Sequence, residues 1–250
     1  MSTPPLILLH GAWHSGAIWT PVVARLREQG LDVFAPDLPG HGASSLPLQK
    51  VSLRRYVESV QALLQELSAP AIVVGHSMAG MVLAQCSSDF PALIREAIYL
   101  CAYLPRDGES VFDLMALARA ENKAELPIET ALRMSEDKRS CSIDPAVAAS
   151  LFYGDASTEL AATAAAKLAV QATLPLAGKV KLVAENFAQV PRTYVCCTRD
   201  AVIPLWQQRS MLRRQSCQEL LQIESDHSPF LSHTDLLVDL FAARLHAANR

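Results

Sequence analysis

The sequence has no excess of basic residues and no obvious basic amphipathic segment. It contains 22 Lys and Arg against 25 Asp and Glu, which gives a formal net charge of -3. Because nucleic-acid binding needs a basic face, this balance argues against a nucleic-acid partner. The lack of a basic amphipathic helix argues in the same way against binding at a membrane surface.

Paired cysteines and a targeting signal are also missing. None of the six cysteines forms a C-x-x-C pair, and Cys196 and Cys197 stand inside an apolar, strand-like run. We therefore expect buried free thiols rather than disulfides or a metal site. The amino-terminal MSTPPLILLHG has no basic n-region and no small-residue cleavage site after its apolar run, which predicts a cytoplasmic protein.

No hydrophobic run is long and unbroken enough to cross a membrane. Residues 67–88 carry no charged side chain, but Pro70, Gly75, His76 and Gly80 interrupt them. A strand, a sharp turn and a helix explain this segment better. The chain of 250 residues is 50% hydrophobic and 19% charged, so it can bury a large core near the upper size of a single one.

Short apolar runs alternate with helical patterns along most of the chain. Strands are expected over residues 6–9, 33–35, 71–74, 97–101, 193–198 and 220–223. Helices are expected over residues 15–29, 52–67 and 78–90, with a last helix after residue 223. Strands separated by helices imply right-handed crossovers, and strands rich in Val, Ile and Leu suit burial on both faces. The pattern predicts an α/β fold with a mostly parallel six-stranded sheet flanked by helices.

The interval 105–185 departs from this alternation. It is helical in tendency, with an alanine-rich stretch over residues 159–169, and contains no obvious strand of the main series. About eighty residues between successive strands far exceed an ordinary connection. We therefore expect a core of residues 1–104 and 186–250 with an inserted helical cap over 105–185. Two ordinary crossover helices are the alternative.

The stretch VVGHSMAG places a serine directly between an expected strand and an expected helix. This is the context of a nucleophile elbow, in which the serine occupies a strained turn. The turn requires small residues two positions away, which Gly75 and Ala79 supply, with Gly80 next to them. We expect Ser77 to be a catalytic nucleophile. The alternative is a serine that caps the following helix.

A serine hydroxyl needs a base to remove its proton, and the base needs a carboxylate to orient it. Among the seven histidines, His227 follows the last expected strand, at the sheet edge where parallel α/β sites form. Asp200 follows the preceding strand, and the order Ser77, Asp200, His227 is that of the α/β hydrolases. Asp226 and Asp107 are the alternative acids.

An ester hydrolase also needs backbone N–H groups that bind the developing oxyanion. Met78, directly after the serine, is one candidate, and Ala12 in the HGAW turn after the first strand is the other. His10 and His41 are expected to support loops, and His14 is a candidate to line a pocket.

Six segments carry a resemblance to a known family: LILLHGAWHSGAIW, APDLPGHGAS, VVGHSMAG, LFYGDAS, CTRDAVIP and SDHSPFLS. Together and in this order they resemble the α/β-hydrolase superfamily, over nearly the whole chain. More narrowly, the chain resembles the plant methyl esterase and hydroxynitrile lyase group, which includes the salicylate-binding methyl esterases. The resemblance implies an α/β-hydrolase fold with a cap between two strands.

The group holds two chemistries, and two positions separate them. The lyases most similar to this chain carry a threonine where Gly11 stands and a lysine where Ser228 stands; a second kind of lyase uses an asparagine near Gly11. None of these is present. The resemblance therefore favours a serine carboxylesterase that hydrolyses small, largely apolar aryl or methyl esters through an acyl-enzyme. Cyanohydrin cleavage and a non-catalytic ligand receptor are the alternatives, and a thioesterase or perhydrolase would share the same residues.

Further expectations concern the pocket, cofactors and partners. A serine triad needs neither a metal nor an organic cofactor, so none is expected. The expected partner is a small-molecule ester, and the resemblance suggests a homodimer. Candidate pocket residues, each of which is equally consistent with ordinary core, are Trp13, Met78, Phe112, Phe152, Tyr153 and Trp206.

Overall fold

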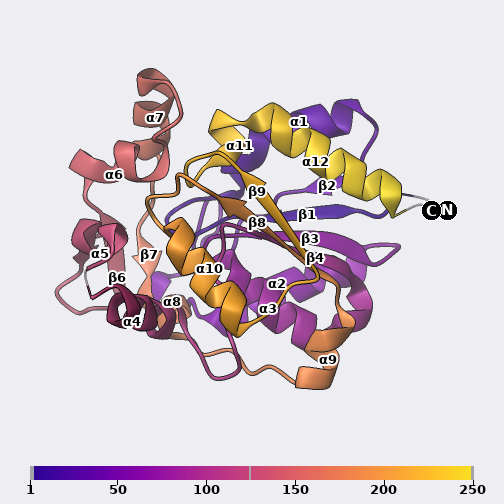
Figure 1. The fold of residues 1–250 in the computed structure, drawn as a ribbon, viewed down its shortest axis with the longest axis horizontal. Helices are drawn as coiled ribbons and strands as arrows, with labels where there is room; N and C mark the ends of the chain where they lie inside the picture. The colour runs from indigo at the N-terminus through magenta and orange to yellow at the C-terminus, as the bar shows by residue number, and fades with distance from the viewer. Residues whose placement is uncertain (1–2, 124, 249–250) are drawn as a thin grey trace.

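The computed structural model describes residues 3–123 and 125–248. Its centre is a six-stranded sheet with the strand order β2-β1-β3-β4-β8-β9 (Figure 1). Every neighbouring pair in this sheet is parallel, as predicted. The strands are β1 (Leu6–Leu9), β2 (Val33–Phe34), β3 (Ala71–His76), β4 (Ile94–Leu100), β8 (Arg192–Cys197) and β9 (Glu219–Ile223).

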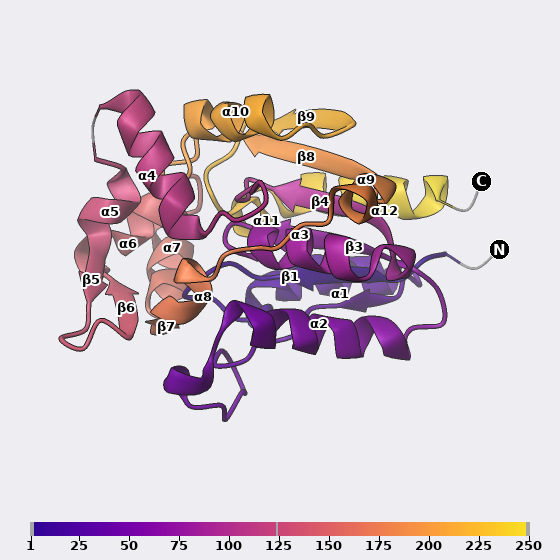
Figure 2. The same ribbon diagram turned by 90° about the horizontal axis from the view of Figure 1, so that it is seen from below.

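Helices cover both faces of the sheet, so alternate residues of a central strand enter two separate cores. In β1, Leu6 and Leu8 pack on one side, whereas Ile7 and Leu9 pack on the other. The first face is covered by α1 (Thr20–Glu28), α11 (Pro229–Ser232) and α12 (Thr234–Ala247) (Figures 1 and 2). The second face is covered by α2 (Leu53–Glu66), α3 (Ala79–Asp89), α9 (Ala184–Gln189) and α10 (Leu205–Arg214).

Local sequence explains where several elements begin and end. The predicted helix over 15–29 divides into a 3-10 helix, η1 (Gly16–Trp19), and α1, because Pro21 suits the first turn of a new helix. Gly30 follows α1 with φ of +76°, a left-handed conformation that ends helices. Two further 3-10 helices are η2 (Leu48–Lys50) and η3 (Pro91–Leu93).

Most of the chain between β4 and β8 lies over the carboxyl ends of the central strands, on the left of Figure 2, whereas α9 lies at the other end of the sheet. We call residues 105–185 the inserted segment. Its helices are α4 (Val111–Asn122), α5 (Pro127–Ala131), α6 (Pro145–Phe152), α7 (Thr158–Ala165) and α8 (Thr173–Ala177). It also contains an antiparallel sheet, which the sequence did not predict, of β5 (Leu132–Met134), β6 (Ser140–Ile143) and β7 (Gln171–Ala172).

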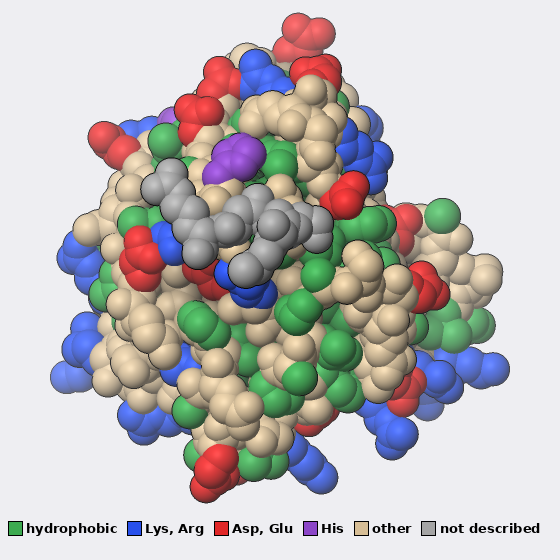
Figure 3. Space-filling view, turned by 90° about the vertical axis from the view of Figure 1, so that its right-hand side faces the viewer, with side chains coloured by type: hydrophobic (Ala, Val, Ile, Leu, Met, Phe, Trp, Pro, Cys, Tyr) green, Lys and Arg blue, Asp and Glu red, His purple; other side chains and the backbone are tan. Residues whose placement is uncertain are grey.

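The cysteines, the helices and the surface charges can be compared with what the sequence predicts. All six cysteines are free and five of them are buried, as expected. Within residues 3–123 and 125–248, no helix combines the length and the apolar character that crossing a bilayer requires. On the face that carries the two ends of the chain, Lys and Arg side chains are interspersed with Asp and Glu (Figure 3).

Candidate active site

Ser77 occupies a sharp turn between β3 and α3. Its φ is +54°, a left-handed conformation that is strained for a residue with a side chain. The turn is crowded, because a Cβ on Gly75 would lie 2.9 Å from the carbonyl oxygen of Ala79. A Cβ on Gly80 would lie only 2.0 Å from the carbonyl oxygen of Tyr103. Glycine at these two positions therefore allows the backbone approach that presents Ser77.

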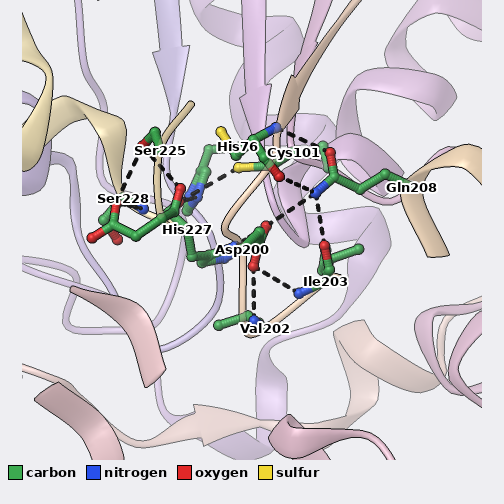
Figure 4. A network of polar contacts seen from close by, with 12 residues as sticks. His76, Cys101, Asp200, Val202, Ile203, Gln208, Ser225, His227 and Ser228 are labelled. Carbon is green, nitrogen blue, oxygen red and sulfur yellow. Dashed lines mark hydrogen bonds and ion pairs between the residues drawn. The ribbon is translucent and has the colours of Figure 1, made fainter. Parts of the chain in front are cut away.

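His227 and Asp200 lie in hydrogen-bond contact at the ends of neighbouring strands. Nδ1 of His227 is 2.8 Å from Oδ2 of Asp200, and both side chains are buried (Figure 4). Oδ1 of Asp200 accepts hydrogen bonds from the amides of Val202 (2.7 Å) and Ile203 (2.9 Å). Because Nδ1 faces a carboxylate, it carries the ring proton, and Nε2 is the nitrogen that can accept another.

Nε2 of His227 is buried and makes no hydrogen bond with any described residue. In particular, it is not hydrogen-bonded to the Ser77 hydroxyl in this conformation. Contacts between a nucleophile and its base are often long before substrate binds and shorten in the complex. The arrangement thus leaves the basic nitrogen unpaired in the protein interior.

The two alternative acids have other partners. Oδ1 of Asp226 accepts from the amide of Ser228 (3.0 Å) and the hydroxyl of Ser232 (2.9 Å), so this carboxylate organises its own turn. Oδ1 of Asp107 accepts from the amide of Leu182 (2.7 Å). Of the three candidates, the structure brings only Asp200 to the His227 ring.

Two side chains bind the main chain of the His227 turn. Nε2 of His76 is 2.9 Å from the His227 carbonyl oxygen, and Sγ of Cys101 is 3.5 Å from it (Figure 4). Together with the His227 ring, His76 and Cys101 are also the one group in the described part of the chain whose spacing could hold a metal ion. Their ligand atoms lie within 4.8 Å of one another. Both donors are already directed at the carbonyl, so the cluster is explained as support for the turn.

The turn after β1 lies against Ser77. A Cβ on Gly11 would be 2.8 Å from Cβ of Ser77 and 3.3 Å from its Oγ. Ala12 and Met78 line the same cavity as Ser77. Within the described residues, neither of their backbone amides donates a hydrogen bond. Two free amides next to a serine hydroxyl can bind an oxyanion.

His14 connects this turn to the inserted segment. Its Nδ1 is 2.7 Å from the carbonyl oxygen of Ala12, and its Nε2 is 2.7 Å from the hydroxyl of Tyr153. Nδ1–H therefore donates to the carbonyl, and the tyrosine hydroxyl donates to Nε2. Burial lowers the pKa of His14 to about 4, so the ring is neutral near pH 7 and has both nitrogens engaged.

The cavity beside Ser77 is apolar. Of the pocket residues expected from the sequence, Trp13, Met78 and Phe112 line it. Apart from Ser77 and the phenol of Tyr103, every lining side chain is hydrophobic. The residues not foreseen are Tyr103, Val111, Met115, Ile128, Leu132, Leu176 and Val202.

The remaining expected pocket residues lie elsewhere. The Phe152 ring is 5.8 Å from the His227 ring and 6.0 Å from that of Trp13, but Phe152 is not part of the cavity lining. Tyr153 contacts His14, as described above. Trp206 lines a separate surface depression together with Arg209 and other residues of α10.

Comparison with known proteins identifies the family. Residues 6–240 match the alpha/beta hydrolase family. The chain belongs to this family. The six-stranded sheet lies within the residues that match this family, and the resemblance to the plant methyl esterase group holds in the relatives below.

Three similar proteins differ in how much of their length the chain covers and in what their names say they bind or act on. Methylesterase 11 of Arabidopsis thaliana, a chloroplastic protein whose own assignment is provisional, is 26% identical over 245 residues. That match covers 95% of this chain but only 63% of the relative, so the chain spans less than two thirds of that protein. Salicylic acid-binding protein 2 of Nicotiana tabacum is 27% identical, with 90% of both chains covered. The pyrethroid hydrolase of Sphingobium wenxiniae is 26% identical, with 97% and 88% covered.

A crystal structure of a pyrethroid hydrolase has the same fold. It superimposes with a TM-score of 0.85 over 99% of both chains, at 23% sequence identity. At this identity the comparison establishes the fold of the chain alone.

Proposed function

We propose that this hydrolase is a serine carboxylesterase, in which Ser77 is the nucleophile, His227 the general base and Asp200 the acid that orients it. The observation that carries the proposal is the His227–Asp200 contact of 2.8 Å, which leaves Nε2 as the unpaired nitrogen. The left-handed serine turn and the two free amides at Ala12 and Met78 support the same chemistry.

Acylation begins when Nε2 of His227 takes the proton of the Ser77 hydroxyl as Oγ attacks the ester carbonyl. The carbonyl oxygen becomes an oxyanion, which the amides of Ala12 and Met78 stabilise. Asp200 stabilises the resulting imidazolium through Nδ1–H. The imidazolium then gives its proton to the alkoxy oxygen, the C–O bond breaks and the alcohol leaves.

Deacylation repeats the sequence with water. Nε2 removes a proton from water, the hydroxide attacks the acyl carbonyl, and the second oxyanion occupies the same two amides. When this intermediate collapses, Oγ of Ser77 recovers a proton from His227 and the carboxylic acid is released. Every proton in the cycle is carried by the histidine, so the chemistry is completed by residues of this chain.

The substrate proposed is a small, largely apolar ester with an aryl or methyl group. The hydrophobic lining of the cavity beside Ser77 favours an uncharged acyl group, because no charged side chain lines it to pair with an ionised one. Relatives named as methylesterase and pyrethroid hydrolase support ester hydrolysis at low identity.

The same geometry weighs against cyanohydrin cleavage. A threonine at position 11 would bring its Cβ to 2.8 Å from Cβ of Ser77, so the surrounding backbone would have to shift. The position after the histidine holds Ser228, a buried neutral side chain that offers no positive charge to a cyanide leaving group.

The proposed nucleophile is tested with Ser77→Ala. We expect kcat for p-nitrophenyl acetate to fall by at least about 10³-fold, because no other group can form the acyl-enzyme. Ser87→Ala is the matched control: its hydroxyl is also buried, has no hydrogen-bond partner and lies in α3. We expect Ser87→Ala to retain turnover, and both variants to keep the circular dichroism spectrum of the wild type.

The alternatives give different outcomes. A non-catalytic receptor would form no stoichiometric serine adduct with a fluorophosphonate probe. A lyase would release cyanide from mandelonitrile faster than the uncatalysed rate, in a reaction that Ser77→Ala abolishes. Normal ester hydrolysis by Ser77→Ala would reject the esterase. The expected cytoplasmic location, the lack of a cofactor and the homodimer remain predictions.

A further inference from the structure

The stretch LFYGDAS belongs to the inserted segment, yet three of its residues contact His227 or the turns next to the proposed catalytic residues. The Phe152 ring is 5.8 Å from that of His227, and the Tyr153 hydroxyl binds Nε2 of His14. Asp155, in the turn between α6 and α7, reaches the turn that carries His227. The mechanism proposed above uses none of these residues.

Asp155 and Asp226 bind each other's main chain. Oδ2 of Asp155 accepts from the amide of Asp226 at 2.7 Å, and Oδ2 of Asp226 accepts from the amide of Asp155 at 3.0 Å. Asp226 directly precedes His227. The reciprocal pair thus fixes the inserted segment to the main chain one residue from the proposed base.

Arg199 extends the contact to the neighbouring strand. Its guanidinium binds both oxygens of Asp155, with Nη2 at 2.9 Å from Oδ2 and Nε at 3.2 Å from Oδ1. The same side chain binds the carboxylate of Glu224 (2.6 Å) and its carbonyl oxygen (2.7 Å). Arg199 directly precedes Asp200, so a single carboxylate joins the two turns that carry the proposed base and acid.

The ion pair favours the charged carboxylate. Burial alone raises the pKa of Asp155, but the hydrogen bonds from Arg199 and from the Asp226 amide lower it overall. Asp155 is therefore ionised near pH 7. Its two oxygens accept hydrogen bonds from three donors on two turns, namely Nε and Nη2 of Arg199 and the amide of Asp226. A charged, forked contact of this kind is more directional than a neutral hydrogen bond.

We propose that Asp155 is a positioning residue of the active site, which holds the turns of His227 and Asp200 in register from the inserted segment. The proposal rests on the function proposed above. A displacement of reacting groups by about 1 Å can cost about a hundredfold in rate, so a side chain outside the chemistry can control kcat. The inserted segment then does more than cover the cavity: it completes the geometry of the proton relay.

The test is Asp155→Asn, which keeps the size of the side chain and removes its charge and one acceptor. We expect kcat for p-nitrophenyl acetate to fall about ten- to a hundredfold with little change in KM, because the cavity lining does not include Asp155. We expect the His227 Nδ1–H proton to resonate far downfield in the wild type because of its bond to Asp200, and in the variant this resonance should shift or broaden. A merely structural residue would leave that resonance unchanged in the folded protein.

Asp144→Asn is the matched control in the same segment. Asp144 also combines an arginine partner, Arg133 at 2.5 Å, with a backbone donor, the amide of Ala146 at 3.0 Å. Its side chain is 27% exposed, against 20% for Asp155, but it lies at the other end of α6. We expect this variant to retain kcat and the NMR resonance even if its melting temperature falls.

Arg199→Gln covers the case in which Asp155→Asn does not fold. The Arg199 side chain is 44% exposed, so its loss is tolerated more easily, and we expect a smaller fall in kcat in the same direction. If the folded variants keep kcat within about twofold of an active wild type, the positioning role is wrong. If instead the wild type and Ser77→Ala do not differ in turnover, the esterase proposal itself fails.

Discussion

Asp200 is a buried carboxylate with a donor on each oxygen. Two backbone amides bind Oδ1, and the His227 ring binds Oδ2, with Nε2 of Gln208 at 3.5 Å on the same oxygen. Gln208 also donates to the carbonyl oxygens of Cys197 and Ile203. The carboxylate can rotate only by breaking several of these bonds, which keeps one oxygen directed at the imidazole.

The acid is tested with Asp200→Asn. An asparagine amide can donate to Nδ1 and so favour the other tautomer, in which Nε2 carries the proton and cannot act as a base. We expect kcat to fall by about 10⁴-fold, the scale seen when a triad carboxylate is replaced by its amide. Asp107→Asn, at one of the two alternative acids, should retain turnover. Assays of both variants with p-nitrophenyl acetate would reverse the assignment if only Asp107→Asn were inactive.

At the residue scale, chain order favours Asp200 over Asp226 as the acid, and Asp200 is the one that lies against the His227 ring. The adjacent Asp226 turned out to hold its own turn through Ser228 and Ser232. Gln208 is not predicted, because a single glutamine in a helix carries no motif. Asp155 lies within LFYGDAS, but that segment alone assigns no role to its aspartate. Their contacts join residues far apart in sequence, which local patterns do not encode.

At the scale of elements, the main strands were predictable and the small ones were not. Strands buried on both faces are rich in Val, Ile and Leu, as in β1 (LILL) and the first four residues of β3 (AIVV). Strands β8 (RTYVCC) and β9 (ELLQI) contain only short apolar stretches, which are still long enough to mark a strand. Strands β5, β6 and β7 have only three, four and two residues, too few to show a period. The second sheet therefore depends on tertiary packing rather than on a local signal.

Helix α4 is an element whose stability bears on the cavity, because it supplies Val111, Phe112 and Met115 to the lining. Its first turn is closed by a capping box: Oγ of Ser110 accepts from the amide of Asp113, and the Asp113 carboxylate accepts from the amide of Ser110. These bonds satisfy donors that the start of a helix leaves free.

Ser110→Ala should therefore destabilise the protein by about 1 kcal/mol. For a chain of this size, a loss of that kind lowers the melting temperature by about 2–4 °C. Ser59→Ala is the control for the loss of a helix hydroxyl that does not cap. Ser59 lies inside α2, and its hydroxyl donates a hydrogen bond to the Tyr56 carbonyl oxygen of the preceding turn. Differential scanning calorimetry should show a change within about 0.5 kcal/mol for Ser59→Ala. Equal losses in the two variants would show that the cap contributes nothing.

At the scale of the whole molecule, buried neutral histidines link stability to pH. Burial lowers the pKa of His10 to about 3 and that of His14 to about 4, and it also lowers the pKa values of His41 and His76. In the unfolded chain these rings titrate near 6.5. Below that pH the unfolded state binds more protons than the folded state, so the free energy of unfolding decreases as the pH falls.

We therefore expect urea unfolding midpoints to be nearly constant above about pH 7.5 and to fall steadily between about pH 6.5 and about pH 4. Each histidine contributes up to about 1.4 kcal/mol for each pH unit in this window. His14→Asn should reduce the slope, because it removes one of these buried rings. A midpoint that stays constant down to pH 4 would show that these rings are protonated in the folded protein.

The two ends of the described chain lie on the side of the sheet opposite the inserted segment (Figures 1 and 2). β1 begins there, and α12 finishes there after covering one face of the sheet. An affinity handle, a fused reporter or a solid support attached at either end would thus be remote from the Ser77 cavity. Immobilised preparations should leave that cavity open to solutes, whichever end is chosen for attachment.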